Sequence, residues 1–162
     1  MSYPAIDCAN WFIAKAAEFG DLTTHLKVQK MLYYGQAWAL ALLEQPLFDE
    51  EIQAWAHGPV VPEVFHHFKP FGWKALDIPP MEQLPQFDAD TLGVLEQVFE
   101  TYSDMSAKTL EAMTHGDQPW ISARGGLAAE MRCETVMPKA AIRDYFVRKY
   151  EIDQATHQQK AA

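Results

Sequence analysis

Histidine is the residue type with the most chemical potential in the middle of this chain. Neutral imidazole is a common zinc or iron ligand, so the histidines raise the hypothesis of a metal-dependent hydrolase. The four histidines in question are His57, His66, His67 and His115. His66 and His67 are adjacent in an expected helix and so point about 100° apart, which does not suit one shared ion. No HExxH motif and no spaced cysteine pair accompanies them. We therefore expect no metal site and no cofactor, and rank this hypothesis low.

The second group that could do chemistry is the acidic run Asp49, Glu50 and Glu51. General acid–base catalysis needs a buried carboxyl with a shifted pKa and a partner group nearby. Adjacent acids are typical of a solvated turn instead, where they could form a patch for a cationic partner. The sequence also lacks a GxSxG nucleophile motif and a phosphate-binding GK[ST] motif. We therefore predict a binding protein that is not an enzyme.

Aromatic side chains are the third group. Tyr33, Tyr34 and Trp38 fall on one expected helix, and adjacent helical positions cannot all face inward. We therefore expect one of the two tyrosines at a surface or groove. A second aromatic set surrounds an expected extended segment: Trp55, Phe65, Phe68, Phe71 and Trp73. Aromatic side chains are favoured in protein interfaces, although most of these suit core packing. The predicted partner-binding residues are Tyr33, Tyr34, Trp38, Asp49, Glu50, Glu51 and Trp55.

Composition narrows the classes of partner. The chain has 162 residues, of which 49% are hydrophobic, and its net charge is −9. That length suits one domain, and an acidic chain does not bind nucleic acid through its phosphates. A basic protein partner fits better. Cys8 and Cys133 have no CxxC partner, which indicates buried free thiols in a reducing compartment. Because no signal peptide or membrane-length apolar stretch is present, we expect a soluble, cytoplasmic protein without membrane contact.

The strongest structural signal is a long helix between Thr23 or Thr24 and Pro46. Its apolar positions cover much of its girth, as in a helix at the centre of a domain. Lys27, Lys30 and Glu44 are expected on its exposed remainder. A first helix over residues 5–19 should precede it and end at Gly20.

An extended insertion should follow. Ile52, Ala54 and Ala56 alternate with polar or aromatic residues, which predicts a short strand, and Gly58-Pro59 predicts a turn after it. A short helix should begin at Pro62, and residues 70–85 should be irregular.

Helices return in the second half, with capping residues at Asp88 or Asp90, Ser106 and Asp117, and a last helix after Pro138. The predicted fold is mainly α: a compact single-domain helical bundle around a long central helix, with a short extended insertion. Residues 151–162 form a polar C-terminal tail that we expect to fray.

Three stretches in this order resemble the Panacea domain, also described as the phage-associated GepA or SocA-like antitoxin family. They are 26–38 (LKVQKMLYYGQAW), 47–60 (LFDEEIQAWAHGPV), and 106–120, which includes THGDQPW. The resemblance covers about residues 5–150, and we assign the domain to residues 3–150.

The resemblance implies an antitoxin that is encoded beside its cognate protein toxin and neutralises it by direct binding. Toxins paired with this family are of unrelated kinds. For this acidic chain we expect a basic or nucleotide-handling toxin. One branch of the family instead delivers its toxin to an AAA+ protease, which is the alternative function. A homo-oligomer is left open.

The motif residues themselves have either a structural or a binding role, and the resemblance does not distinguish the two. Thr114, His115, Pro119 and Trp120 suit a helix–helix corner in which the imidazole bonds a backbone carbonyl. The full set is Lys27, Gln29, Lys30, His57, Gly58, Pro59, Val60, Thr114, His115, Pro119 and Trp120.

Overall fold

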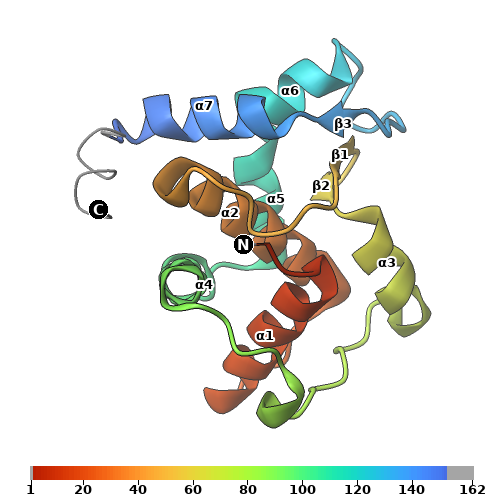
Figure 1. Ribbon diagram of the computed structural model, residues 1–162. Helices are drawn as coiled ribbons and strands as arrows, with labels where there is room; N and C mark the ends of the chain where they lie inside the picture. Colours follow the sequence, from red (N-terminus) through yellow and green to blue (C-terminus); the bar gives the residue numbers. More distant parts are fainter. Residues whose placement is uncertain (1, 153–162) are drawn as a thin grey trace.

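A 19-residue helix, α2 (His25–Leu43), runs through the middle of the molecule (Figure 1). The structure is a computed structural model and describes residues 2–152, so residues 153–162 of the predicted tail lie outside the described residues. The Thr24 hydroxyl caps α2 by accepting a hydrogen bond from the Lys27 N–H. The helix ends where Glu44 adopts a left-handed conformation with φ of 56°. The prediction of a central helix apolar around most of its girth is confirmed.

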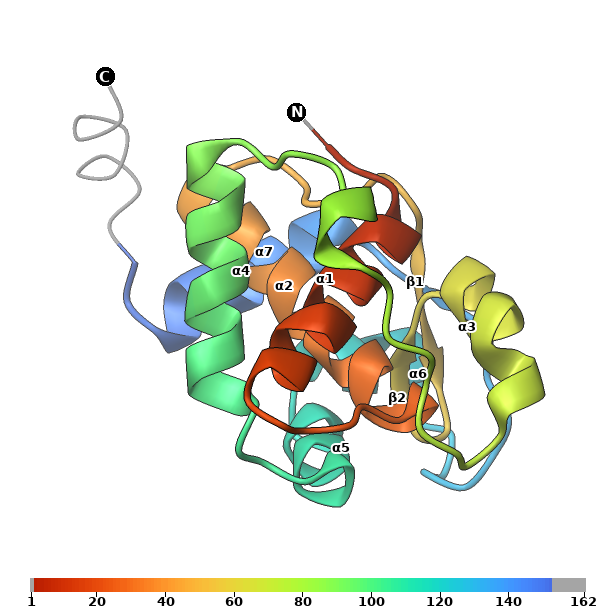
Figure 2. The same ribbon diagram turned by 90° about the horizontal axis from the view of Figure 1, so that it is seen from below.

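Six further α-helices lie around α2 in the described residues, and α1, α3, α4, α5 and α7 all contact it. Figure 2 shows α4 on one side of the α1–α2 pair and α3 on the other. The predicted caps at Asp88 and Ser106 are confirmed, because each side chain accepts a hydrogen bond from a first-turn N–H. The mainly α, single-domain prediction is also confirmed. These helices are α1 (Ala5–Glu18), α3 (Pro62–Phe68), α4 (Ala89–Tyr102), α5 (Ala107–His115), α6 (Gln118–Arg124) and α7 (Lys139–Lys149).

A small antiparallel sheet lies beside one end of α2, with the strand order β2-β1-β3. The strands are β1 (Ile52–Trp55), β2 (Gly58–Val60) and β3 (Val136–Met137). The extended segment is therefore confirmed, but the predicted turn at Gly58-Pro59 is wrong. Trp55 pairs with Gly58, so the chain turns at Ala56 and His57 and the Gly-Pro pair lies within β2. The two-residue strand β3 was not predicted, because two residues are too few to show alternation.

The expectation that Tyr33 or Tyr34 lies at a surface or groove is wrong. Both rings are buried because α4 and α7 pack against α2 around them. Tyr33 donates a hydrogen bond to Asp117 Oδ2 over 2.8 Å, and the Tyr34 ring stacks on Tyr102 with a centroid distance of 3.9 Å. Neither ring presents surface to a partner, so neither is available for contact with a toxin.

The acidic run ties the first residues of the chain to the start of α7. Glu50 is half-buried, and its Oε2 accepts a hydrogen bond of 2.8 Å from the N–H of Ala5, the first residue of α1. Asp49 accepts a hydrogen bond from the Ser2 hydroxyl. Glu51 lies 3.4 Å from the Lys139 ammonium group. A carboxylate at a helix N-terminus satisfies a free N–H and interacts favourably with the helix dipole.

Replacing Glu50 should therefore cost more stability than replacing its neighbour. We expect Glu50→Ala to lower the free energy of unfolding by about 1 kcal/mol, as for loss of a capping group. Glu51→Ala removes an exposed ion pair and should change it by less than about 0.5 kcal/mol. Urea denaturation of the two variants measures both values. Equal losses would contradict the capping role of Glu50.

Candidate functional site

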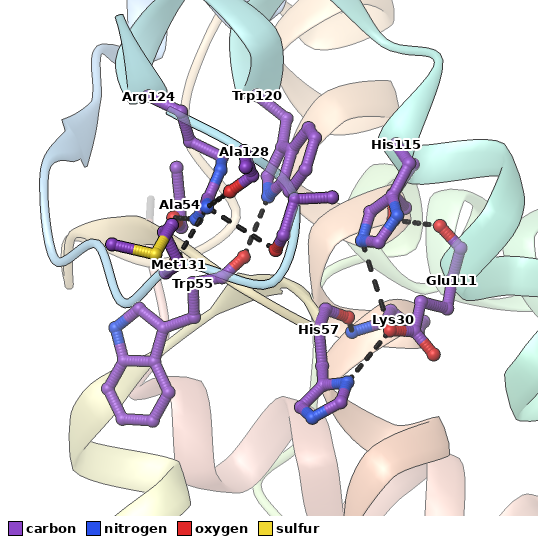
Figure 3. A network of polar contacts seen from close by, with 12 residues as sticks. Lys30, Ala54, Trp55, His57, Glu111, His115, Trp120, Arg124, Ala128 and Met131 are labelled. Atoms are coloured by element: carbon purple, nitrogen blue, oxygen red, sulfur yellow. Dashed lines mark hydrogen bonds and ion pairs between the residues drawn. The ribbon is translucent and has the colours of Figure 1, made fainter. Parts of the chain in front are cut away.

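Lys30 is the centre of the largest group of motif residues. We expected it to be exposed, but it has 0% exposure, because the β1–β2 hairpin and α5 cover its side of α2. Its ammonium group donates a hydrogen bond to the backbone carbonyl of His57, at the turn of the hairpin (Figure 3). Burial lowers the pKa of Lys30 to about 8, and the nearby Glu111 carboxylate opposes that shift. A charge-bearing group is thus held in the core by a carbonyl from another segment.

Gly58 leaves the space that the Lys30 ammonium group occupies. A Cβ atom at residue 58 would lie 2.8 Å from Lys30 Nζ and 2.9 Å from Thr114 Oγ1. Gly58 also has φ of 109°, which side-chain-bearing residues rarely adopt. The motif residues Lys30, Gly58 and Thr114 therefore meet at a point with room for hydrogen alone.

Glu111 joins two of the motif histidines. Its Oε1 lies 2.9 Å from His57 Nδ1 and 3.9 Å from His115 Nε2 (Figure 3). Burial lowers the pKa of His115, and the Glu111 carboxylate opposes that shift. Sequence reasoning did not single out Glu111. Its spacing of four residues from His115 places both on one helix face, but the contact with His57 depends on how the hairpin docks.

His115 and Trp120 form the corner between α5 and α6 that the sequence predicts. Their rings stack with a centroid distance of 4.2 Å. The Trp120 indole N–H donates a 2.9 Å hydrogen bond to the carbonyl of Trp55. The buried Arg124 donates to the carbonyl of Ala54 and to further carbonyls in residues 128–131. The hairpin is thus held by α6 on one side and by Lys30 on the other.

The remaining motif residues of α2 also bond to backbone atoms. The Gln29 side-chain oxygen accepts a hydrogen bond from the Val61 N–H, just after β2, and the Lys27 ammonium group donates to the carbonyl of Ser103. Pro59 and Val60 are buried within β2. Most of the motif residues therefore converge on the hairpin, although they come from separate stretches of sequence, whereas Lys27 bonds to the end of α4.

The predicted partner-binding residues do not converge in the same way. Trp38 lies at the other end of α2, where its indole N–H donates to the Tyr102 hydroxyl. The acidic run lies near the N-terminus of α1 and near Lys139. Of this set, Trp55 lines a hollow in the surface.

That hollow is a groove of about 880 Å³, which we call the hairpin groove. It lies between the start of α2, the hairpin turn, α3 and the segment 130–134. Trp55, His57, Phe65, Trp73 and Cys133 contribute to its lining. A volume of this size can take a bound ligand or a partner side chain with its neighbours.

Three further features of the described residues bear on the predictions from the sequence. Within residues 2–152, no group of three or more histidine, cysteine or acidic side chains is arranged to hold a metal ion. Within the same residues, no helix has both the length and the apolar character needed to cross a membrane. Cys8 and Cys133 are both free and buried, as predicted.

Comparison with known proteins places these residues in a family. A family model described as antitoxin SocA-like, Panacea domain, matches residues 28–121, which is more than half of the chain. The chain belongs to the SocA-like antitoxin family. The matched range of this Panacea domain includes Lys30, Gly58, Glu111 and Trp120. The resemblance inferred from the three stretches is therefore confirmed.

A curated relative agrees with this assignment. Antitoxin SocA of Caulobacter vibrioides (strain NA1000 / CB15N) is 28% identical over 157 residues, covering 90% of this chain and 84% of that protein. No solved structure matches the chain significantly.

Two glycine substitutions test the close approach at residue 58. We expect Gly58→Ala to lower the free energy of unfolding by at least about 2 kcal/mol, through backbone strain and contact with Lys30. Gly93→Ala is the matched control, because Gly93 is exposed in α4 with nothing within 4 Å of the added Cβ. It should raise stability by about 0.5–1 kcal/mol. Urea denaturation distinguishes the two; an equal response would contradict the packing described at Gly58.

The buried lysine also predicts a dependence of stability on pH. Its pKa falls from 10.5 to about 8 on folding, so the unfolded chain binds more protons between these values. The contribution of Lys30 to stability should therefore rise with pH in this window. Relative to a Lys30→Met variant, the wild-type chain should gain about 2 kcal/mol between about pH 7 and about pH 9.5. Denaturation at both pH values measures this gain, and parallel curves would show that Lys30 titrates normally.

Proposed function

We propose that this chain is an antitoxin that neutralises a cognate protein toxin by stoichiometric binding, without catalysis. The observation that carries the proposal is the family match, together with a curated relative named antitoxin SocA. The family membership gives the antitoxin role, and direct binding is the mechanism that we infer for this chain.

The positions of the motif side chains support a binding protein. Lys30, Trp120 and Gln29 each make a hydrogen bond with the backbone of the hairpin or of the residue that follows it. Their polar atoms thus stabilise the scaffold from inside. Because these side chains bond internally, contacts that are specific for a partner come from other residues, on the surface of the domain.

The charge of the chain supports a basic toxin. A net charge of −9 attracts a cationic protein and speeds its encounter at low ionic strength. A toxin that binds nucleotides or nucleic acid through basic residues has this property. Neutralisation then follows if the antitoxin covers the active site or the entrance for substrate.

Titration of the toxin tests the proposal. The product of the adjacent gene should arrest growth when expressed alone, and co-expression of this chain should restore growth. In vitro, toxin activity should fall linearly with added antitoxin and reach zero near one equivalent. Antitoxin stripped of metal by EDTA should give the same titration, which separates binding from metal-dependent hydrolysis.

Other outcomes of these experiments would favour a different mechanism or contradict the proposal. Full inactivation at a small fraction of one equivalent would overturn the stoichiometric mechanism in favour of catalysis. A shortened toxin half-life in cells would identify an adaptor for an AAA+ protease. A harmless neighbouring gene product, or toxicity that persists with the antitoxin present, would contradict the proposal itself.

A further inference from the structure

The hairpin groove has an aromatic wall. The buried bonds of Lys30 and Trp120 to the hairpin, which we call the motif network, hold this wall in place. Figure 3 shows the Trp55 and His57 side chains extending from the hairpin on the side away from Trp120. Phe65 of α3 contacts Trp55 with a centroid distance of 4.8 Å and contacts His25 at 4.7 Å. These rings form a continuous apolar surface along the groove.

An exposed aromatic side chain extends this surface. Trp73 lines the groove and is 89% exposed, the largest value among the exposed large hydrophobic side chains described. Large exposed apolar patches mark interaction sites more often than scattered single residues do.

The charges in the lining indicate which chemistry the groove accepts. Besides His25, His57 and His66, it contains two basic residues, Lys69 and Arg132, and two acidic residues, Glu130 and Glu134. Arg132 and Glu134 form an ion pair of 2.8 Å with each other. This balance gives no local excess of positive charge for a phosphate group, and so disfavours a nucleotide. An uncharged, apolar occupant fits the groove, and the net charge of −9 favours one that a basic protein carries.

Two polar side chains in the lining are incompletely bonded. Within the described residues, His25 Nε2 and Gln29 Nε2 are buried without hydrogen-bond partners. Both residues are more than nine-tenths buried, and both line the groove. A buried polar atom without a partner is costly. Because both residues line the groove, their unpaired nitrogens leave unused hydrogen-bonding capacity beside its aromatic rings.

We propose that the hairpin groove is the toxin-binding surface, and that it takes an apolar segment of a basic toxin with a bulky aliphatic or aromatic side chain between Trp55 and Trp73. This inference rests on the proposed function, because it assigns a surface to the same binding event. It gives the motif network a purpose beyond stability, since Lys30 and Trp120 hold the wall that contacts the toxin.

A pair of exposed aromatic residues provides the test. The Trp73 side chain is almost free of contacts, so Trp73→Ala should fold normally, and circular dichroism and urea denaturation check this. Loss of a tryptophan at the centre of an interface should weaken toxin affinity at least about tenfold. Phe19→Ala is the control, because Phe19 is 66% exposed at the end of α1 and does not line the groove. Isothermal titration calorimetry should give this variant an affinity equal to that of the wild type.

Hydrogen exchange of the wild-type complex gives a readout that does not depend on variants. Bound toxin should slow exchange in residues 55–73 and 130–134, which line the groove. Equal affinities of the two variants, or protection confined to α4 and α7, would overturn the groove assignment while leaving toxin neutralisation intact. Failure of the wild-type chain to bind the toxin would overturn the proposed function first. Concentration-dependent dimers of the chain alone, with the same residues protected, would assign the groove to a second copy.

Discussion

The burial of the Lys30 ammonium group is the constraint on which the architecture depends. A charged group in the core is stable only with a polar partner, and α2 cannot supply one because its own carbonyls bond within the helix. The partner comes instead from the hairpin, through the carbonyl of His57. That bond requires glycine at residue 58, where a side chain would collide with the ammonium group. It also brings the Glu111 carboxylate close enough to stabilise the positive charge. One buried cation thus determines where three distant segments meet.

A second polar centre fixes the opposite part of the bundle. Asp117 is 2% exposed and accepts hydrogen bonds from the hydroxyls of Tyr33 and Tyr145, with Lys149 3.6 Å away. Burial raises the pKa of Asp117, while these donors oppose the shift. We predicted that Asp117 caps the helix that follows it, and this prediction is wrong. Asp117 does precede α6, but its side chain accepts hydrogen bonds from α2 and α7 and makes no capping bond to α6. Because Lys30 and Tyr33 lie one turn apart on α2, the two centres together hold the hairpin, α6 and α7 in one arrangement.

Local signals explain what could be predicted from the sequence. The caps at Thr24, Asp88 and Ser106 and the alternation in β1 all act over a few residues, so the main elements were recognisable. The burial of Lys30 and Tyr34 depends on which distant segments cover α2, and no local pattern contains that information. The hairpin groove likewise depends partly on local signals and partly on the packing of distant segments. Trp55 was named as a candidate because of its type, whereas the alignment of Trp55 with Trp73 and with the segment 130–134 arises from packing.

The motif network and the groove are two sides of the same hairpin. Trp120 and Lys30 bond to the carbonyls of Trp55 and His57, and the side chains of these two residues extend into the groove. A family that shares this scaffold can therefore change the rings and charges of the groove without altering the buried bonds beneath it. In such an arrangement, specificity and stability depend on different side chains.

The structure of the chain bound to the product of the adjacent gene tests most directly the claim that the toxin binds in the hairpin groove. We predict an apolar side chain of the toxin in the hairpin groove, beside Trp55 and Trp73, with the hydrogen bond between Lys30 and His57 intact. A complex in which the toxin lies over α4 or α7 and leaves the groove open to solvent would contradict it.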